Sequence, residues 1–167
     1  SSMGRLFDAV SALSGVCLYA NYEGQPAIEL EMIGDEAETG AYSFQYQEKD
    51  GKIVIKPEPV IEQIVNDLQR GERKEKISAK FHNGVSEMVI FVCERIKEQT
   101  GIKEVALSGG VFQNFWLLSK VKKGLEEKRF KVYVHHQVPT NDGGIALGQA
   151  IIGLRRMKDV LSGSNEG

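Results

Sequence analysis

The chain has 167 residues and a formal net charge of −2; 41% of its residues are hydrophobic and 26% are charged. These values predict a soluble globular domain or a piece of a larger one, and they exclude a disordered chain, a collagen-like repeat and a disulfide scaffold. No apolar run approaches the roughly 20 residues of a membrane span, no secretory leader opens the chain, and the balanced charge argues against a dedicated nucleic-acid binder. We therefore expect a cytoplasmic protein with reduced cysteines and no membrane or nucleic-acid partner.

Helical spacing of apolar residues dominates the first part of the chain. The helices that this spacing predicts are residues 6–15, 25–32, 57–71 and 76–99. The alternating residues 42–46 and the apolar run 53–55 flank Asp50-Gly51, which predicts a β-hairpin. We expect the longest helix, 76–99, to pack its apolar stripe on a sheet.

The last third of the chain alternates between strands and helices. Short apolar runs predict strands at 104–107 and 131–134, and helical spacing predicts helices over 111–127 and from Gly144 to near Met157. Strand–helix–strand–helix with short connections predicts parallel pairing and an α/β fold. The Gly/Ser-rich tail, 162–167, is expected to be frayed.

Each predicted strand in this part is followed by a glycine pair. Ligands bind beyond the carboxyl ends of the strands in open α/β sheets, so Gly109-Gly110 and Gly143-Gly144 are both expected at that edge. The first pair is either a turn whose backbone amides face a phosphate or adenosine at a helix start, or a turn that needs glycine only for packing. It is neither a Walker A nor a G-x-G-x-x-G loop.

Single chemical groups give less information. The stretch 141–144, Asn-Asp-Gly-Gly, is either a helix N-cap or the site of a carboxylate, Asp142, that binds a metal ion. Asp8 lies on the first predicted helix, where a solvated surface acid is the ordinary interpretation. The three histidines form neither H-x-x-x-H nor H-E-x-x-H, so the chain contains no complete catalytic zinc motif.

Five segments, taken in chain order, resemble the C-terminal part of HypF, the carbamoyltransferase family of [NiFe]-hydrogenase maturation. They are residues 4–10, 22–31, 81–82, 107–114 and 139–150. The motifs S-G-G-V-F-Q-N and N-D-G-G-I-A-L-G-Q are the specific ones, and the resemblance covers about residues 1–154. It implies the C-terminal lobe of an actin/Hsp70-like (ASKHA, RNase H-like) ATPase core. TsaD synthases, which modify tRNA adenosine, and carbamoyltransferases of antibiotic biosynthesis share that core.

The resemblance also implies a mechanism. HypF-type enzymes make carbamoyl-adenylate from carbamoyl phosphate and ATP in one domain, and the domain resembled here transfers the carbamoyl group to the C-terminal cysteine of HypE. The transfer site of that family holds an iron or zinc ion, bound by an H-x-x-x-H pair, a nearby Asp and the Asp of N-D-G-G, which maps to Asp142. The same carry-over assigns Gly109, Gly110 and Asn114 to the nucleotide turn and Asp8 to an acid near the ribose.

The departures from the family pattern are as informative. The chain lacks the H-x-x-x-H pair, the acylphosphatase domain, the zinc-finger cysteines and the adenylate-forming domain, so we expect residues 1–167 to be a single-domain fragment that is inactive alone. The alternatives are a TsaD-like threonylcarbamoyl transferase acting on tRNA and a non-catalytic nucleotide-binding module. The F-Q-N of residues 112–114 and the absence of a basic excess favour HypF over the tRNA enzyme.

Overall fold

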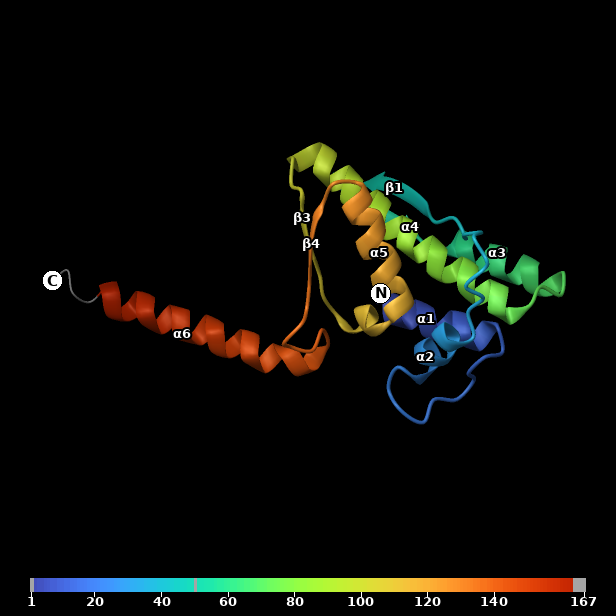
Figure 1. Cartoon of the computed structure of the whole chain (residues 1–167), viewed down its shortest axis with the longest axis horizontal. Helices are drawn as coiled ribbons and strands as arrows, with labels where there is room; N and C mark the ends of the chain where they lie inside the picture. Colours follow the sequence, from blue (N-terminus) through green and yellow to red (C-terminus); the bar gives the residue numbers. More distant parts are fainter. Residues whose placement is uncertain (1, 50, 164–167) are drawn as a thin grey trace.

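The structure, a computed structural model, describes residues 2–49 and 51–163. A helical body carries two small sheets, and one helix, α6, runs away from it (Figure 1). The elements are α1 (Met3–Leu13), α2 (Gln25–Met32), β1 (Gln45–Lys49), β2 (Lys52–Lys56), α3 (Glu58–Gln69), α4 (Lys74–Thr100), β3 (Glu104–Leu107), the 3₁₀ turn η1 (Gly110–Gln113), α5 (Phe115–Glu127), β4 (Lys131–Val134), the 3₁₀ turn η2 (Asp142–Gly144) and α6 (Ile145–Gly163).

The predicted hairpin is confirmed, with a later start. Strands β1 and β2 pair antiparallel, from Gln45 opposite Lys56 to Lys49 opposite Lys52, and Asp50 of the expected turn lies outside the described residues. The residues before Gln45 are not strand: Tyr42 is buried, and its amide donates to the carbonyl of Lys80 on α4. Core burial, rather than strand pairing, therefore explains the apolar residues in 42–44.

The predicted parallel pair is confirmed. β3 lies parallel to β4, from Glu104 opposite Lys131 to Leu107 opposite Val134, and α5 connects the two strands. The helix expected from residue 111 begins only at Phe115, because Asn114 has extended backbone and caps α5. The residues before it form η1, so the strand-to-helix connection is a shaped turn rather than a helix start.

The core lies between the helices. Its largest fully buried side chains include Phe7 of α1, Leu30 of α2, Phe81 of α4 and Leu125 of α5. The main neighbour of α4 is α5, followed by α2 and α3, so the expectation that α4 packs chiefly on a sheet is wrong. Gly84 allows α4 to approach the backbone of the segment that contains Tyr42, because a Cβ at position 84 would collide with the carbonyl oxygen of Tyr42.

Helix α6 differs from the rest of the fold. Within residues 145–157, whose side chains the structure describes, its large apolar residues are exposed: Ile145, Leu147, Ile151, Ile152, Leu154 and Met157. The helix continues to Gly163, so it includes the first two residues of the tail that is expected to be frayed, and residues 164–167 lie outside the described residues. None of the helices in the described ranges has the length and apolar content needed to cross a bilayer.

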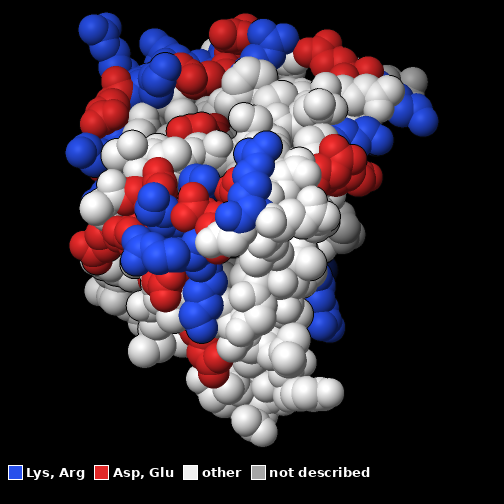
Figure 2. All heavy atoms as spheres, turned by 90° about the vertical axis from the view of Figure 1, so that its right-hand side faces the viewer, with Lys and Arg blue, Asp and Glu red and all other residues white. Residues whose placement is uncertain are grey.

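Charged side chains of both signs are interspersed on the face shown in Figure 2. A partly buried network joins α3 and α4: the Asp67 carboxylate accepts from Lys80 Nζ at 2.9 Å and from the Tyr42 hydroxyl at 2.8 Å. Hydrogen bonds from Lys80 and Tyr42 outweigh burial and lower the pKa of Asp67. The network stabilises the helix pair on the side of the body away from the glycine turns.

Candidate functional site

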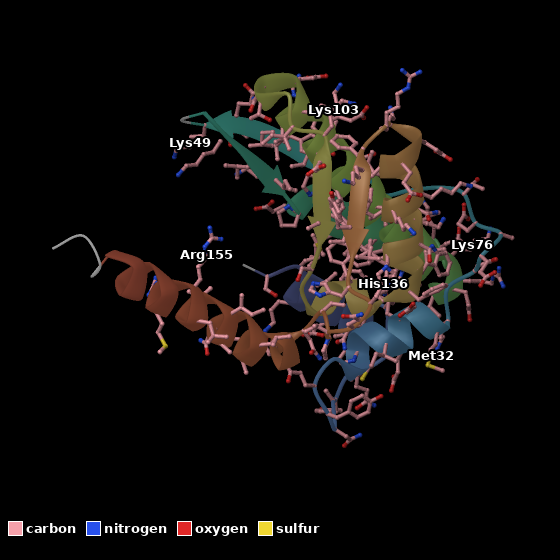
Figure 3. The ribbon with its side chains drawn as sticks, turned by 60° about the vertical axis from the view of Figure 1, so that its left-hand side comes forward. Met32, Lys49, Lys76, Lys103, His136 and Arg155 are labelled. Atoms are coloured by element: carbon pink, nitrogen blue, oxygen red, sulfur yellow. The ribbon has the colours of Figure 1, made fainter. Side chains whose placement is uncertain are left out.

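A cleft of about 770 Å³ lies where α1, α2 and the loop between them face the segments that follow β3 and β4. Figure 3 shows the carboxyl ends of these strands directed toward α2, with His136 just beyond β4. Among the residues that line the cleft are Asp8, Gly110, Asn114 and Asp142. Gly109 does not line it but directly precedes Gly110 in the chain. Residues more than 130 positions apart in the sequence are therefore brought to one site.

The Gly109-Gly110 turn is held by the loop after β4. The amide of Gly109 donates to the Thr140 carbonyl at 2.8 Å, and the Thr140 hydroxyl donates to the Gly109 carbonyl at 2.5 Å. The φ of Gly109 is +102°, a conformation that favours glycine. Gly110 has no such need, because a Cβ there would meet only the Cβ of Asn141, at 4.0 Å. Open space beside Gly110 favours the close approach of a ligand over packing as the reason for this glycine.

The start of α5 is already occupied within the protein. The amide of Leu117 donates to Asn114 Oδ1 at 2.8 Å, and the amide of Trp116 donates to Glu31 Oε1 at 3.0 Å. A ligand at this turn would therefore meet the backbone amides of Gly110 and Val111, the first two residues of η1, which have no hydrogen-bond partner among the described residues. This differs from the expected phosphate site at a helix N-terminus.

Asn114 is buried, and both polar atoms of its amide have partners inside the protein. Oδ1 accepts from Leu117, and Nδ2 lies 2.9 Å from Nε2 of His82, a fully buried residue of α4. Burial lowers the pKa of His82 to about 4, and the nearby Lys120 contributes in the same direction. Asn114 would therefore contact a ligand through its backbone, or only after its side chain had rotated away from these partners.

Asp142 is not the helix cap. The cap of η2 is Asn141, whose Oδ1 accepts from the amide of Gly143 at 3.1 Å. The carboxylate of Asp142 is exposed on the cleft, and no hydrogen bond or ion pair to it is found in the described part of the chain. The capping interpretation of this sequence therefore applies to Asn141 and leaves Asp142 available to a ligand.

The metal site implied by the family resemblance is incomplete in this chain. Among the side chains of residues 2–49 and 51–157, there is no group of three or more His, Cys, Asp or Glu placed to hold a metal ion. His135 contacts Ser108 instead, with Nε2 and Oγ 2.9 Å apart. One carboxylate does not hold a dication tightly, so Asp142 fits as one ligand of a site completed by other residues.

Helices α1 and α2 add two charged residues to the cleft, Arg5 and Glu31, that the sequence analysis does not single out. A guanidinium nitrogen of Arg5 lies 3.8 Å from a carboxylate oxygen of Asp8, in a partly exposed ion pair. Arg5 and Glu31 fall within the segments that resemble the family, residues 4–10 and 22–31, which was the only signal for them in the sequence.

Comparison with known proteins places the chain in a class of carbamoyl-group transferases with a Kae1-like domain. Residues 1–149 match the family described as "Carbamoyltransferase, Kae1-like Domain, second subdomain", and the chain belongs to this family. It is 35% identical over 152 residues to the carbamoyltransferase HypF of Synechocystis sp., covering 90% of this chain and 19% of that protein. The chain thus spans about a fifth of the length of this relative.

Solved structures agree with this assignment. The crystal structure of full-length HypF in the phosphate- and nucleotide-bound form matches with a TM-score of 0.89 and 45% identity, over 94% of this chain and 21% of that one. T. kodakarensis HypF matches with a TM-score of 0.78 and 26% identity, over 95% of this chain and 20% of that one. The expected fold, a lobe of the actin/Hsp70-like core, is confirmed.

A tRNA-modifying enzyme is a more distant relative. The tRNA N6-adenosine threonylcarbamoyltransferase of Caldicellulosiruptor bescii is 27% identical over 141 residues, covering 78% of this chain and 39% of that protein. Its similarity is in keeping with a core shared by the two kinds of transferase.

Proposed function

We propose that this chain is the C-terminal lobe of the transfer domain of a longer HypF-type carbamoyltransferase. The enzyme would move the carbamoyl group from carbamoyl-adenylate, made from carbamoyl phosphate and ATP, to the C-terminal cysteine of HypE, for the cyanide ligands of [NiFe]-hydrogenase. In this step the cysteine sulfur, having lost its proton to solvent, would attack the carbamoyl carbon; a C–S bond would form, the C–O bond to the phosphate of AMP would break, and AMP would leave with that bond's electron pair. The observation that carries the proposal is the convergence of Asp8, Gly110, Asn114 and Asp142 on one cleft.

The nucleotide would lie along the wall formed by η1 and α1. Gly110 leaves room for close approach, and the carboxylate of Asp8, which lines the same cleft, would accept hydrogen bonds from ribose hydroxyls. The HypF structure that is most similar in sequence among those above is described as phosphate- and nucleotide-bound, which supports a nucleotide here.

Asp142 would contribute one ligand of an iron or zinc ion, and the remaining ligands would come from residues outside this chain. The chemistry supplied at this site would be that of a Lewis acid, acting on the carbamoyl oxygen or on the adenylate phosphate. The role of this chain would be to hold the Asp142 carboxylate at the cleft. Asn141 caps η2, and the Thr140–Gly109 hydrogen bonds connect the loop to the Gly109-Gly110 turn.

The test is carbamoyl transfer by the full-length enzyme to the HypE cysteine, followed by mass spectrometry with carbamoyl phosphate and ATP supplied. We expect transfer by the wild type and a large loss in Asp8→Asn, with folding unchanged because Asp8 is partly exposed. An enzyme that leaves HypE unmodified but carbamoylates another acceptor would contradict the proposal. Because the proposed reaction consumes ATP, it would take place in the cytoplasm.

Two other functions remain as competing outcomes of that test. The similarity to the C. bescii enzyme favours a threonylcarbamoyl transferase, which would modify tRNA in place of HypE. The incomplete metal site favours a nucleotide-binding module, which would bind ADP but transfer nothing. The higher identity to HypF proteins and the interspersed surface charge lead us to prefer the HypF-type reaction.

A further inference from the structure

His82 joins three helices at the back of the proposed nucleotide turn. It is fully buried on α4. Its ring stacks on Trp116 of α5, with centroids 5.4 Å apart and planes at 23°, and meets the ring of Phe7 of α1 edge-on at 5.2 Å. A ring held on two sides by aromatic neighbours has little freedom to rotate, so its nitrogens have fixed directions.

The hydrogen bonds around His82 assign its proton. Nδ1 lies 2.8 Å from the backbone carbonyl of Ser78, which only accepts, so Nδ1 carries the hydrogen. On the other side, Asn114 Oδ1 accepts from the Leu117 amide, which leaves Nδ2 to donate to His82 Nε2 at 2.9 Å. Only the neutral ring protonated at Nδ1 satisfies both neighbours at once. A backbone carbonyl on α4 thus fixes, through one imidazole, which way the amide of Asn114 points.

Asn114 in turn holds the turn that lines the cleft. It ends η1 and caps α5, and its own amide donates to the Val111 carbonyl at 3.2 Å. Helix α2 supports the same point, because Ser78 Oγ donates to the carbonyl of Leu30 and Glu31 accepts from the Trp116 amide. The support for η1 thus comes from Ser78 and His82, which are buried behind the cleft, and from Glu31, which lies at the cleft itself.

We propose that His82 is a positioning residue of the nucleotide site: as an Nδ1-protonated acceptor it orients Asn114 and so fixes the Gly110–Gln113 turn against the nucleotide. The inference rests on the proposed function for the presence of a nucleotide. It adds a residue outside the cleft, since His82 does not line it. It also assigns Asn114 the role of turn support in place of a side-chain ligand contact.

The first test reads the tautomer directly, by ¹⁵N NMR of the histidine rings in this chain. We expect wild-type His82 to be neutral with the hydrogen on Nδ1 from pH 5 to 8. Asn114→Asp keeps the acceptor for Leu117 but faces Nε2 with a carboxylate, so it should make the ring cationic and raise its pKa. A wild-type ring protonated at Nε2, or an Asn114→Asp ring that titrates like wild type, would overturn the inference.

The second test measures ADP binding by calorimetry in the full-length enzyme, and the affinity compared is that of the site that Gly110→Val weakens, because the adenylate-forming domain has a nucleotide site of its own. His82→Phe keeps a ring between Trp116 and Phe7 but removes the acceptor, and we expect it to weaken ADP binding about tenfold. His82→Gln should recover most of the affinity, since its amide supplies one donor and one acceptor. The matched control is Phe81→Leu, a buried change one residue away that should lower the melting temperature and leave ADP affinity within about twofold.

The outcomes separate the two proposals. A wild type that does not bind ADP contradicts the proposed function and this inference with it. A wild type that binds ADP, with His82→Phe binding equally well, overturns the inference alone. Equal loss of affinity in His82→Phe and Phe81→Leu also overturns it, because general packing would then explain the effect. If His82→Phe does not fold, the comparison of His82→Gln with wild type and the tautomer measurement decide.

Discussion

The two glycine turns that meet at the cleft are supported in different ways. The Gly109–Gln113 turn stands on the core: Asn114 behind it is buried and bonded to His82, and Glu31 holds the next helix start. For the loop that carries Gly143, the described residues provide no comparable buried hydrogen bond; the loop is held by the Thr140–Gly109 hydrogen bonds and by its own cap at Asn141.

The same contrast continues beyond the cleft. The body that backs the first turn buries large apolar side chains on α1, α2, α4 and α5, whereas α6, which follows the second turn, exposes its large apolar residues over 145–157. The cleft therefore has two walls with different support. The rigid wall, residues 109–113, would position the proposed nucleotide, and the lightly held wall, residues 139–144, presents the carboxylate of Asp142. Each of the following changes should affect one wall and spare the other.

Asp142→Asn should have the largest effect and act only on the lightly held wall. An amide is a poorer ligand for a dication than a carboxylate, so we expect metal content and carbamoyl transfer of the full-length enzyme to fall by more than about 100-fold. Thermal melting should not change, because Asn141 provides the cap. As a control, Asn141→Ala should cost about 1 kcal/mol of local stability. A variant that keeps both metal and activity would show that Asp142 is not a ligand. The isolated wild-type chain should neither bind metal tightly nor transfer carbamoyl.

Leucine truncations compare the body with α6 directly. Leu125 is fully buried, and Leu125→Ala should lower the free energy of unfolding by about 2–5 kcal/mol. Leu154 is 61% exposed, and Leu154→Ala should change it by no more than about 0.5 kcal/mol. Urea unfolding of this chain measures both. A comparable loss in the two variants would mean that α6 packs against the body after all.

Acid should weaken the rigid wall through His82. The folded protein binds a proton there only below about pH 4, whereas the unfolded chain binds it below about 6.5, so lowering the pH favours unfolding. Between pH 7 and pH 5 the loss should be about 2 kcal/mol. His82→Gln should remove most of this slope. The lowered pKa of Asp67 adds a further loss of stability only at more acidic pH, below the ordinary range of a carboxyl. Identical pH profiles for wild type and His82→Gln would contradict the assignment.

Substitution of the paired glycines should separate binding from folding within a single turn. Gly110→Val adds a side chain toward open space in the cleft, so ADP binding by the full-length enzyme should fall about tenfold with under about 1 kcal/mol of lost stability. Gly109→Ala meets a φ of +102° and should cost about 1–3 kcal/mol of stability. If Gly110→Val lost stability and binding in proportion, the glycine would serve packing alone.

Local sequence patterns predicted the elements well where neighbours along the chain decide the structure. The strands at 104–107 and 131–134 have the predicted limits, and the 27-residue helix α4 begins and ends within two residues of the expected range. The helix predicted over 111–127 is present, but its predicted start was wrong. Asn114, a residue suited to capping, ends the 3₁₀ turn η1, and α5 starts at Phe115.

The site could be predicted only as far as motifs reach. Glycine pairs after strands indicated the edge of the sheet, and the resemblance to HypF assigned Asp8 and Asp142. The link between His82 and Asn114 joins residues 32 positions apart, and nothing in the local sequence of either residue indicates it. Which residue of the Asn141-Asp142 pair caps η2 likewise depends on backbone geometry that both residue types can adopt.

The stacking of Trp116 on His82 has a practical consequence. Trp116 is the single tryptophan of the sequence, and Lys120 Nζ lies 5.3 Å from its ring. The intrinsic fluorescence of this chain therefore comes, at 295 nm excitation, from one indole beside the proposed nucleotide turn. Emission intensity and wavelength become a label-free optical signal of the state of the imidazole and of any rearrangement of the turn, without the need to attach a dye.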